Sequence, residues 1–347
     1  MKIPGPGVLF ACLVTATGCS VSTTPEKSET SNNTAGSIER FDPAFDKLVP
    51  ESAIIEKVAG GYQFIEGPVW VPGRPGHLLF SDIPANTVFQ WSEQDGSSVF
   101  MRPVMPEGAT TGGNGGSNGL ALDPNGRLIL CEHGNRRVAR LEDDGNRTTL
   151  ADRHKGGRLN SPNDIVFHSS GAAFFTDPPY GLQKQDEDPN KEQPHNGIYR
   201  LDVDGTVTLL AANQTRPNGI GLSPDERTLY VANSDGPPNR LWMSYPLSND
   251  LTLGDGSVFF DANSIPRPGA PDGLTLDQDG NIYGTGPGGV IVISPNGKHL
   301  GTIATNELPA NAGWGDDGST LYITARTSLY RIRLNAKGLV FKGATGR

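Results

Sequence analysis

The sequence predicts an all-β fold, a six-bladed β-propeller built from four-stranded antiparallel blades. Three observations support this prediction. Gly and Pro contribute 45 and 28 of the 347 residues, without the period of collagen. The apolar residues come in short runs separated by Asp/Gly turns, which is typical of proteins with many strands. A unit of four such runs recurs six times, and repeats of roughly 40 to 50 residues with four short strands are typical of propeller blades.

The repeat is complete in residues 118–150. An Asn-Gly pair precedes the first apolar run, the turn at residues 123–126 leads into the second run, and two further runs follow before Leu150. Equivalent units begin along the chain at intervals of 52, 45, 55, 54 and 39 residues. The residues that open the six units are Glu66, Asn118, Asn163, Asn218, Asp272 and Asn311.

A strand before the first unit is expected to close the ring. Residues 54–59 (IIEKVA) precede the first unit, and the last unit ends soon after residues 329–334. We expect this N-terminal strand to complete the final blade, because a closed ring leaves no open sheet edge. The propeller is therefore expected to cover residues 41–347.

The first 40 residues are expected to lie outside the propeller. Residues 1–18 combine Lys2 with a short apolar stretch, which is typical of a signal peptide and too brief to span a membrane. The junction Gly18-Cys19-Ser20 resembles a bacterial lipobox, although the usual Leu three positions before the Cys is missing. An ordinary signal peptide with an incidental Cys is the alternative. Residues 19–40 are rich in Ser, Thr and Asn and predict a flexible linker.

These features predict an exported lipoprotein that faces the periplasm, with Cys19 as the lipidated residue. Contact with the membrane is expected only through this anchor. The net charge of -9 and the absence of a basic block argue against nucleic acid as a partner, because a phosphate backbone would be repelled.

The six opening residues are expected to form a ring at one mouth of the central channel, because the chain enters every blade from the same face. All six side chains carry oxygen, which suits Ca²⁺, whereas Zn²⁺ favours His or Cys. Glu66 and Asp272 would neutralise a dication. The sequence predicts one bound divalent cation, Ca²⁺, with Zn²⁺, Mn²⁺ and Mg²⁺ as alternatives. A single Asn-Gly pair is usually a turn, but turn chemistry does not account for Glu66 or Asn163.

Eight segments of the chain carry a family resemblance. They are residues 66–70 (EGPVW), 80–84 (FSDIP), 117–120 (SNGL), 131–134 (CEHG), 158–164 (RLNSPND), 175–182 (FTDPPYGL), 216–219 (RPNG) and 271–273 (PDG). With them the chain resembles the gluconolactonase, senescence-marker-protein and luciferin-regenerating-enzyme family, and more closely its bacterial gluconolactonase-like branch. The segments span nearly all of the repeat region.

The resemblance implies a six-bladed propeller with a divalent metal, often Ca²⁺, that hydrolyses a lactone. The metal ligands that it implies are Glu66, Asn163, Asn218 and Asp272. It further implies that Asp272 is the general base and that Asn118 lies beside the substrate. Some animal members carry Arg where this chain has Ser161, which leaves the recognition of a sugar open.

Other residues are candidates for catalysis or substrate binding. A carboxylate that binds Ca²⁺ has a lowered pKa and is a weak base, so Asp164 stands beside Asp272 as a candidate base. His133 follows a second strand and is expected on the active face, where it either contacts substrate or is held by its neighbours. Asn160 and Tyr180 are further candidate substrate contacts. The polar loop at residues 177–197 is either a lid or disordered.

Three functions were compared on this basis: a lactonase, another propeller hydrolase of the phosphotriesterase type, and a non-catalytic ligand-binding propeller. Fold alone does not choose between them, because propellers serve all three. The acidic pair in the ring favours an enzyme. We therefore expect a lactonase whose partner is a small-molecule lactone, a gluconolactone-like sugar lactone first of all.

The lipobox interpretation can be tested by replacing Cys19. We expect the wild-type protein to carry lipid on Cys19 and to sediment with membranes, and the Cys19→Ser variant to lose both properties. Residues 40–347 expressed alone serve as the soluble control. A variant that fractionates with membranes as the wild type does would contradict the interpretation.

Overall fold

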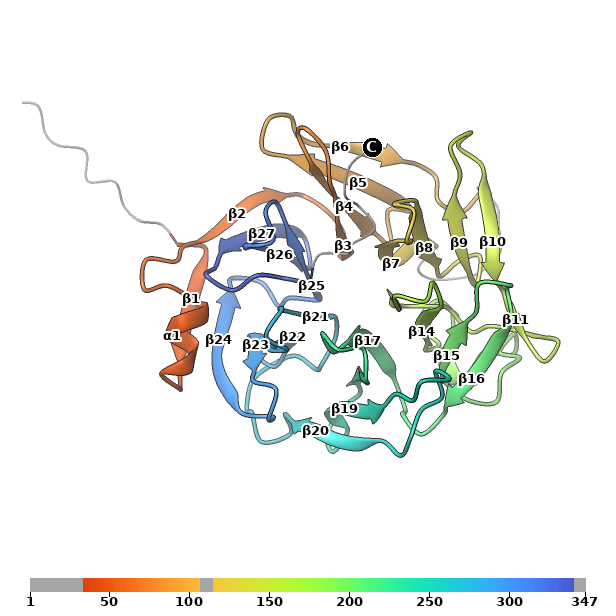
Figure 1. Cartoon of the computed structure of the whole chain (residues 1–347). Helices are drawn as coiled ribbons and strands as arrows, with labels where there is room; N and C mark the ends of the chain where they lie inside the picture. The colour runs from red at the N-terminus through yellow and green to blue at the C-terminus, as the bar shows by residue number, and fades with distance from the viewer. Residues whose placement is uncertain (1–33, 107–114, 340–347) are drawn as a thin grey trace, which may run out of the picture. The chain divides into compact units, whose positions relative to one another are not determined.

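Six antiparallel sheets form a ring in the part of the chain that the structure describes (Figure 1). The structure is a computed structural model, and it describes residues 34–106 and 115–339. The prediction of an all-β, six-bladed propeller is confirmed. The expected signal peptide, Cys19 and most of the expected linker lie outside the described residues. Within these ranges no helix is long and apolar enough to cross a membrane.

Each blade is a meander whose first strand lies nearest to the channel (Figure 1). The first blade consists of β3 (Ile65–Val71), β4 (His77–Asp82), β5 (Thr87–Ser92) and β6 (Gly96–Met101). The second consists of β7 (Ser117–Leu122), β8 (Leu128–Glu132), β9 (Arg137–Leu141) and β10 (Arg147–Ala151). The third consists of β13 (Ile165–Phe167), β14 (Ala173–Asp177), β15 (Gly197–Leu201) and β16 (Val207–Ala211).

The remaining three blades repeat this order. The fourth consists of β17 (Pro217–Leu222), β18 (Thr228–Ser234), β19 (Arg240–Pro246) and β20 (Ser257–Asp261). The fifth contains β21 (Leu274–Leu276), β22 (Ile282–Gly286), β23 (Gly289–Ile293) and β24 (His299–Thr305). The sixth contains β25 (Asn311–Gly315), β26 (Thr320–Ala325) and β27 (Ser328–Arg333). A short β11–β12 ribbon (Arg153–His154 and Gly157–Arg158) connects the second and third blades.

The ring closes in the predicted way. Strand β2 (Ile55–Gly60) pairs antiparallel with β27, with Ile55 opposite Ile332, so an N-terminal strand completes the sixth blade. The closing blade therefore joins residues from both ends of the domain, and β2 covers the outer edge of β27.

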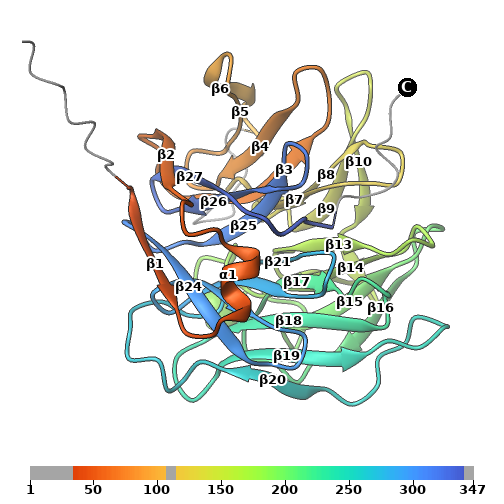
Figure 2. The same ribbon diagram turned by 60° about the vertical axis from the view of Figure 1, so that its left-hand side comes forward.

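The linker expected over residues 19–40 is wrong at its C-terminal end. Residues 36–40 form β1 (Gly36–Arg40), which pairs with β24 as a fifth strand of the fifth blade (Figure 2). The polar composition around residues 36–40 does not indicate a strand. The strand forms because its backbone pairs with β24 and Ile38 packs against the apolar core. Helix α1 (Ala44–Leu48) follows and buries Phe45 and Leu48 in the same core.

The apolar core lies between neighbouring blades. Six clusters of buried side chains are found in the described residues, and each joins two adjacent sheets. Trp242 of β19 is an example: it is fully buried and lies against Gly284 of the next blade, where a Cβ would come within 2.8 Å of the indole nitrogen. Burial of such layers around the whole ring stabilises the positions of the inner strands.

The inner strands approach one another closely at the residue after four of the six ring positions. The Gly119 amide donates to the Asn163 carbonyl over 2.7 Å, and the Gly219 amide donates to the Asp272 carbonyl over 3.2 Å. A Cβ at these positions would lie 2.0–2.6 Å from the neighbouring inner strand, which is shorter than any normal contact. The glycines that share this property are Gly67, Gly119, Gly219 and Gly273.

Adding one methyl group at such a position should push two blades apart. We expect Gly219→Ala to lower the free energy of unfolding by about 1–3 kcal/mol, the usual cost of overpacking. Urea unfolding of this variant can be compared with Gly236→Ala, because a Cβ at Gly236 meets nothing within 4 Å. Equal stability of the two variants would contradict the close approach of the strands.

Candidate active site

One mouth of the channel holds a polar cavity of about 280 Å³. Five of the six predicted ring residues line it: Glu66, Asn118, Asn163, Asn218 and Asp272. Each is the second residue of an inner strand or stands two residues before one. The sixth, Asn311, lines a second cavity on the other side of the ring. The structure thus brings all four predicted metal ligands together with Asn118.

Hydroxyl groups from the second strand of one blade hold the ring position of the next. Ser81 in β4 donates to the Asn118 carbonyl over 2.8 Å, and Thr176 in β14 donates to the Asn218 carbonyl over 2.7 Å. Two further bonds of this kind run from Ser234 to the Pro271 carbonyl and from Thr285 to the Ala310 carbonyl. The ring backbone is therefore fixed by two blades at once, which orients the side chains before any ligand binds.

The carboxyl groups of the cavity repel one another. Burial is the main cause that raises the pKa of Glu66 and of Asp272. The charge of Asp164 raises both further, and the charge of Glu66 also raises the pKa of Asp272. Hydrogen bonds oppose the rise: the Gly67 amide donates to Glu66 Oε2 over 2.9 Å, and the Asn218 side chain bonds to Asp272. A carboxylate pair that is disfavoured by burial and by mutual repulsion is stabilised by a cation between its members.

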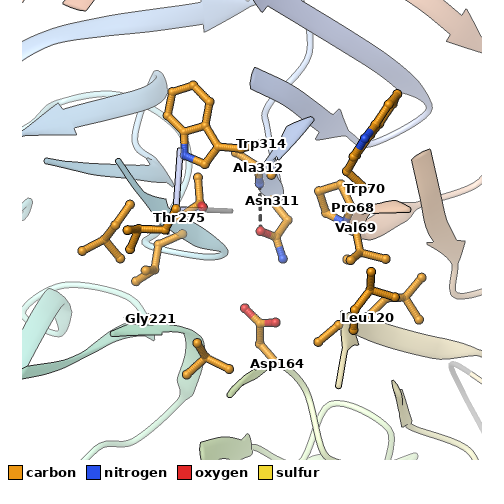
Figure 3. A pocket seen from close by; sticks show the side chains of 18 of the residues that line it. Pro68, Val69, Trp70, Leu120, Asp164, Gly221, Thr275, Asn311, Ala312 and Trp314 are labelled. Atoms are coloured by element: carbon orange, nitrogen blue, oxygen red, sulfur yellow. Dashed lines mark hydrogen bonds between the residues drawn. The ribbon is translucent and has the colours of Figure 1, made fainter. Parts of the chain in front are cut away.

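Asp164 does not line this cavity, although its charge acts on both Glu66 and Asp272. It occupies the position after a ring residue, where four other blades carry Gly, and its carboxyl group lines the second cavity opposite Asn311 (Figure 3). Its oxygens accept bonds from the Ile165 amide over 2.9 Å and the Ile220 amide over 3.4 Å. Burial nevertheless raises the pKa of Asp164 to about 7. The structure therefore separates this candidate base from the lining of the polar cavity.

Three predicted substrate contacts line the polar cavity. His133 is 1% exposed, and burial lowers its pKa to about 4, so the ring is neutral near pH 7. Neither His133 nitrogen nor Asn118 Oδ1 has a hydrogen-bond partner among the described residues. The Tyr180 hydroxyl donates to the Ser234 carbonyl over 3.2 Å. His133 and Asn118 thus present open hydrogen-bonding capacity beside the acidic pair.

The structure does not bring Asn160 to the cavity. Its Nδ2 donates to the carbonyls of Asp177 and His195 over 3.0 and 2.9 Å, so the side chain joins the two ends of the 177–197 loop. Ser161, beside it, donates to the Pro178 carbonyl and accepts from the Gly181 amide. The motif that suggested a substrate contact at Asn160 is instead used to anchor this loop.

Four lining residues were missed by the sequence analysis: Phe64, Ile83, Gln185 and Ser234. Ile83 directly follows β4 and Ser234 ends β18, so both correspond in topology to His133. Their place at the end of a second strand is the same signal that identifies His133. Gln185 belongs to the short 3-10 helix η1 (Gln185–Glu187) inside the long loop, and no repeat pattern places it.

Comparison with known proteins places the chain in a family. The family described as SMP-30/Gluconolactonase/LRE-like region matches residues 64–327, which cover the inner strands of all six blades. The chain belongs to this family. The resemblance that was inferred from the eight segments is confirmed.

Several proteins similar to this chain are named as lactonases. A gluconolactonase from Zymomonas mobilis is 38% identical over 324 residues, which cover 90% of each chain. A pentonolactonase from Haloferax volcanii is 26% identical over 268 residues, 75% of this chain and 80% of that one. A solved structure of a gluconolactonase from Xanthomonas campestris is 30% identical and has a TM-score of 0.73, covering 86% of this chain and 94% of that one. The prediction of a lactonase is confirmed by these relatives.

A cation in this SMP-30/gluconolactonase-like chain would depend on amide oxygens as well as carboxylates. Within residues 34–106 and 115–339, no group of three His, Cys, Asp or Glu side chains is arranged to hold a metal. The donors that could hold one are the carboxylates of Glu66 and Asp272 and the amide oxygens of Asn163 and Asn218. An all-oxygen set of this kind suits a hard cation such as Ca²⁺. The repulsion between the two carboxyl groups fits a positive charge at this position.

Stability of the metal-free protein should depend on pH. The pKa of Asp164 is about 7 in the folded chain and about 4 in the unfolded chain, and those of Glu66 and Asp272 are raised as well. The folded state then binds more protons than the unfolded state, so stability falls as pH rises from about 4 to about 7. We expect the melting temperature in chelator to decrease over this range and Ca²⁺ to reverse part of the decrease.

The control is Asp272→Asn, which removes one of the mutually repelling charges. This variant should show a shallower decrease in chelator and a smaller response to Ca²⁺. A melting temperature of the metal-free wild type that stays constant or rises over the same pH range would contradict the charge arrangement.

Proposed function

We propose that this chain hydrolyses a sugar lactone of the gluconolactone type with the help of one divalent cation, Ca²⁺, at the polar mouth of the channel. The observation that carries the proposal is the pair of mutually repelling carboxyl groups, Glu66 and Asp272, in a cavity that also contains three Asn side chains. The named lactonases among the relatives support the same reaction. The residues that would hold the cation are Glu66, Asn163, Asn218 and Asp272.

Substrate would bind beside the acidic pair. A cavity of about 280 Å³ is at the small end of ligand pockets and suits a single small ring. Asn118 Oδ1 is an open acceptor and neutral His133 offers one donor and one acceptor. These groups orient the ring so that its carbonyl lies toward the carboxylates.

Asp272 is favoured over Asp164 as the general base. Asp272 lines the polar cavity, whereas Asp164 lines the second one and acts on Asp272 only through its charge. Burial and repulsion raise the pKa of Asp272, and a cation bound beside it would lower that pKa, so the two effects oppose each other. A pKa that results from opposing shifts can stay close enough to the working pH for proton transfer.

Ring opening requires the attack of water on the lactone carbonyl carbon. Asp272 accepts one proton from this water as the new C–O bond forms. The proton then passes to the ring oxygen as the old C–O bond breaks, and a hydroxy acid is released. A cation in the site supplies positive charge that stabilises the oxyanion formed by the attack.

Export and anchoring through Cys19 are part of the proposal. The support is the sequence of residues 1–20 alone, with its short apolar stretch and Gly-Cys-Ser junction. The first described strand, β1, begins at Gly36, so residues 20–35 would separate a lipid on Cys19 from the domain.

Replacement of Asp272 tests the mechanism. Asp272→Asn keeps the shape and one oxygen ligand but removes a charge and the proton acceptor, so Ca²⁺ affinity should weaken. Turnover at saturating Ca²⁺ should fall by about 10²–10⁴, the usual contribution of a general base. Acid release from a panel of lactones, followed by pH-stat, measures this directly, with Asp164→Asn as the matched control.

Two outcomes would overturn parts of the proposal. If Asp272→Asn saturated with Ca²⁺ is as active as the wild type while Asp164→Asn is inactive, the base is Asp164. If the wild type opens no lactone, the chain is a non-catalytic ligand-binding propeller.

A further inference from the structure

The 177–197 loop forms a fixed wall of the cavity. Beside the bonds from Asn160 and Ser161, Arg136 donates to the Asn190 carbonyl over 2.8 Å, and Gln193 Nε2 donates to the Gly157 carbonyl over 2.8 Å. These bonds attach the loop to the second blade, to β12 and to the segment before β13. Side chains that the loop presents to the cavity are therefore held in place rather than delivered by closure of a lid.

Gln185 is the residue that this loop places at the rim. It is exposed, begins η1 and lines the polar cavity. Its φ of 49° lies in the left-handed region that favours glycine, and such a conformation persists only where neighbouring groups fix it. The Gln185 side chain thus lies at the cavity although its backbone conformation is unfavourable.

Arg216 orients the Gln185 amide. The guanidinium donates to Gln185 Oε1 over 3.4 Å and pairs with Asp186, which also accepts from Asn196 Nδ2 over 3.0 Å. Because the oxygen of the amide accepts from Arg216, the nitrogen end remains as the donor, and no described residue accepts from Nε2. Arg216 lies two residues before the ring residue Asn218. Its contacts with Gln185 and Asp186 therefore connect the loop to the start of β17.

The cavity then holds a set of hydrogen-bonding groups without protein partners. Of the buried groups, Asn118 Oδ1 accepts and the two His133 nitrogens supply one donor and one acceptor; Gln185, which is exposed at the rim, adds the Nε2 donor. Phe64 and Ile83 supply apolar surface in the same cavity. Buried polar atoms without partners are costly, and adjacent hydroxyl groups on a ring would satisfy both donors and acceptors here.

We propose that Gln185 is a specificity-determining residue that hydrogen-bonds a ring hydroxyl of the substrate, with Asn118 and His133 contacting others, and that Arg216 is its positioning residue. The cavity thus selects a polyhydroxylated lactone over an unsubstituted ring of the same size. Hydrolysis of such a lactone rests on the proposed function, whereas binding of its hydroxyl groups does not.

Kinetics on two lactones test the selectivity. Gln185→Ala should lower kcat/KM for glucono-δ-lactone by about threefold to tenfold, mainly through KM, since one neutral hydrogen bond is lost. Turnover of δ-valerolactone, which has the same ring without hydroxyl groups, should be unchanged. Gln183→Ala, an exposed residue of the same loop, is the control and should affect neither substrate. Equal losses on both lactones, or no loss on the hydroxylated one, would overturn the proposal.

A binding measurement separates this inference from the proposed reaction. The probe is 1,5-anhydroglucitol, which keeps the ring hydroxyls and lacks the lactone carbonyl, and calorimetry measures its affinity for the full Ca²⁺-loaded protein. We expect Gln185→Ala to weaken binding by the same factor as in the kinetics. Wild type that binds this polyol but opens no lactone supports the inference and defeats the proposed function. Wild type that opens lactones while Gln185→Ala binds the polyol unchanged defeats the inference alone.

The role of Arg216 is tested by a double-mutant cycle. Arg216→Ala should raise KM for glucono-δ-lactone with little change in kcat, and Arg216→Lys should restore part of the effect. In the Gln185→Ala background Arg216→Ala should add nothing, because it acts through the Gln185 amide. Additive effects would show that Arg216 acts independently and would overturn its assignment as a positioning residue.

Discussion

The close approach of neighbouring inner strands is the constraint on which the site depends. Where Gly follows a ring residue, two backbones come within hydrogen-bonding distance, as in the bond from the Gly119 amide to the Asn163 carbonyl. This spacing brings side chains from five blades into one small cavity. A Cβ at these positions would widen the ring, and the oxygens would then be too far apart to act on one ligand.

The same constraint concentrates charge where it is unfavourable. Glu66 and Asp272 would be more stable in water than beside each other, and the protein tolerates them because the apolar layers between blades hold the ring together independently. Stability and function are thus assigned to different parts of each blade. The outer strands and interblade clusters stabilise the fold, while residues at or just before the start of five inner strands line the polar cavity.

The repeat in the sequence predicted the fold and most of the site, because a blade recurs with fixed spacing and the ring residues occupy equivalent positions. Individual side chains were harder to predict. Asp164 and Asn163 are adjacent just before β13, yet they line different cavities. Asn160, Gln185 and β1 depend on contacts between distant segments, which no local pattern reveals.

The strand β1 has a mechanical consequence for a chain held by its N-terminus. A force on residues before Gly36 would reach the domain first at β1, the outermost strand of the fifth blade, and at α1. Strand β2, which locks the ring against β27, comes later in the chain. Detachment of β1 would therefore dissipate tension while the ring stays closed, so that the polar mouth would keep its geometry if the N-terminus were pulled.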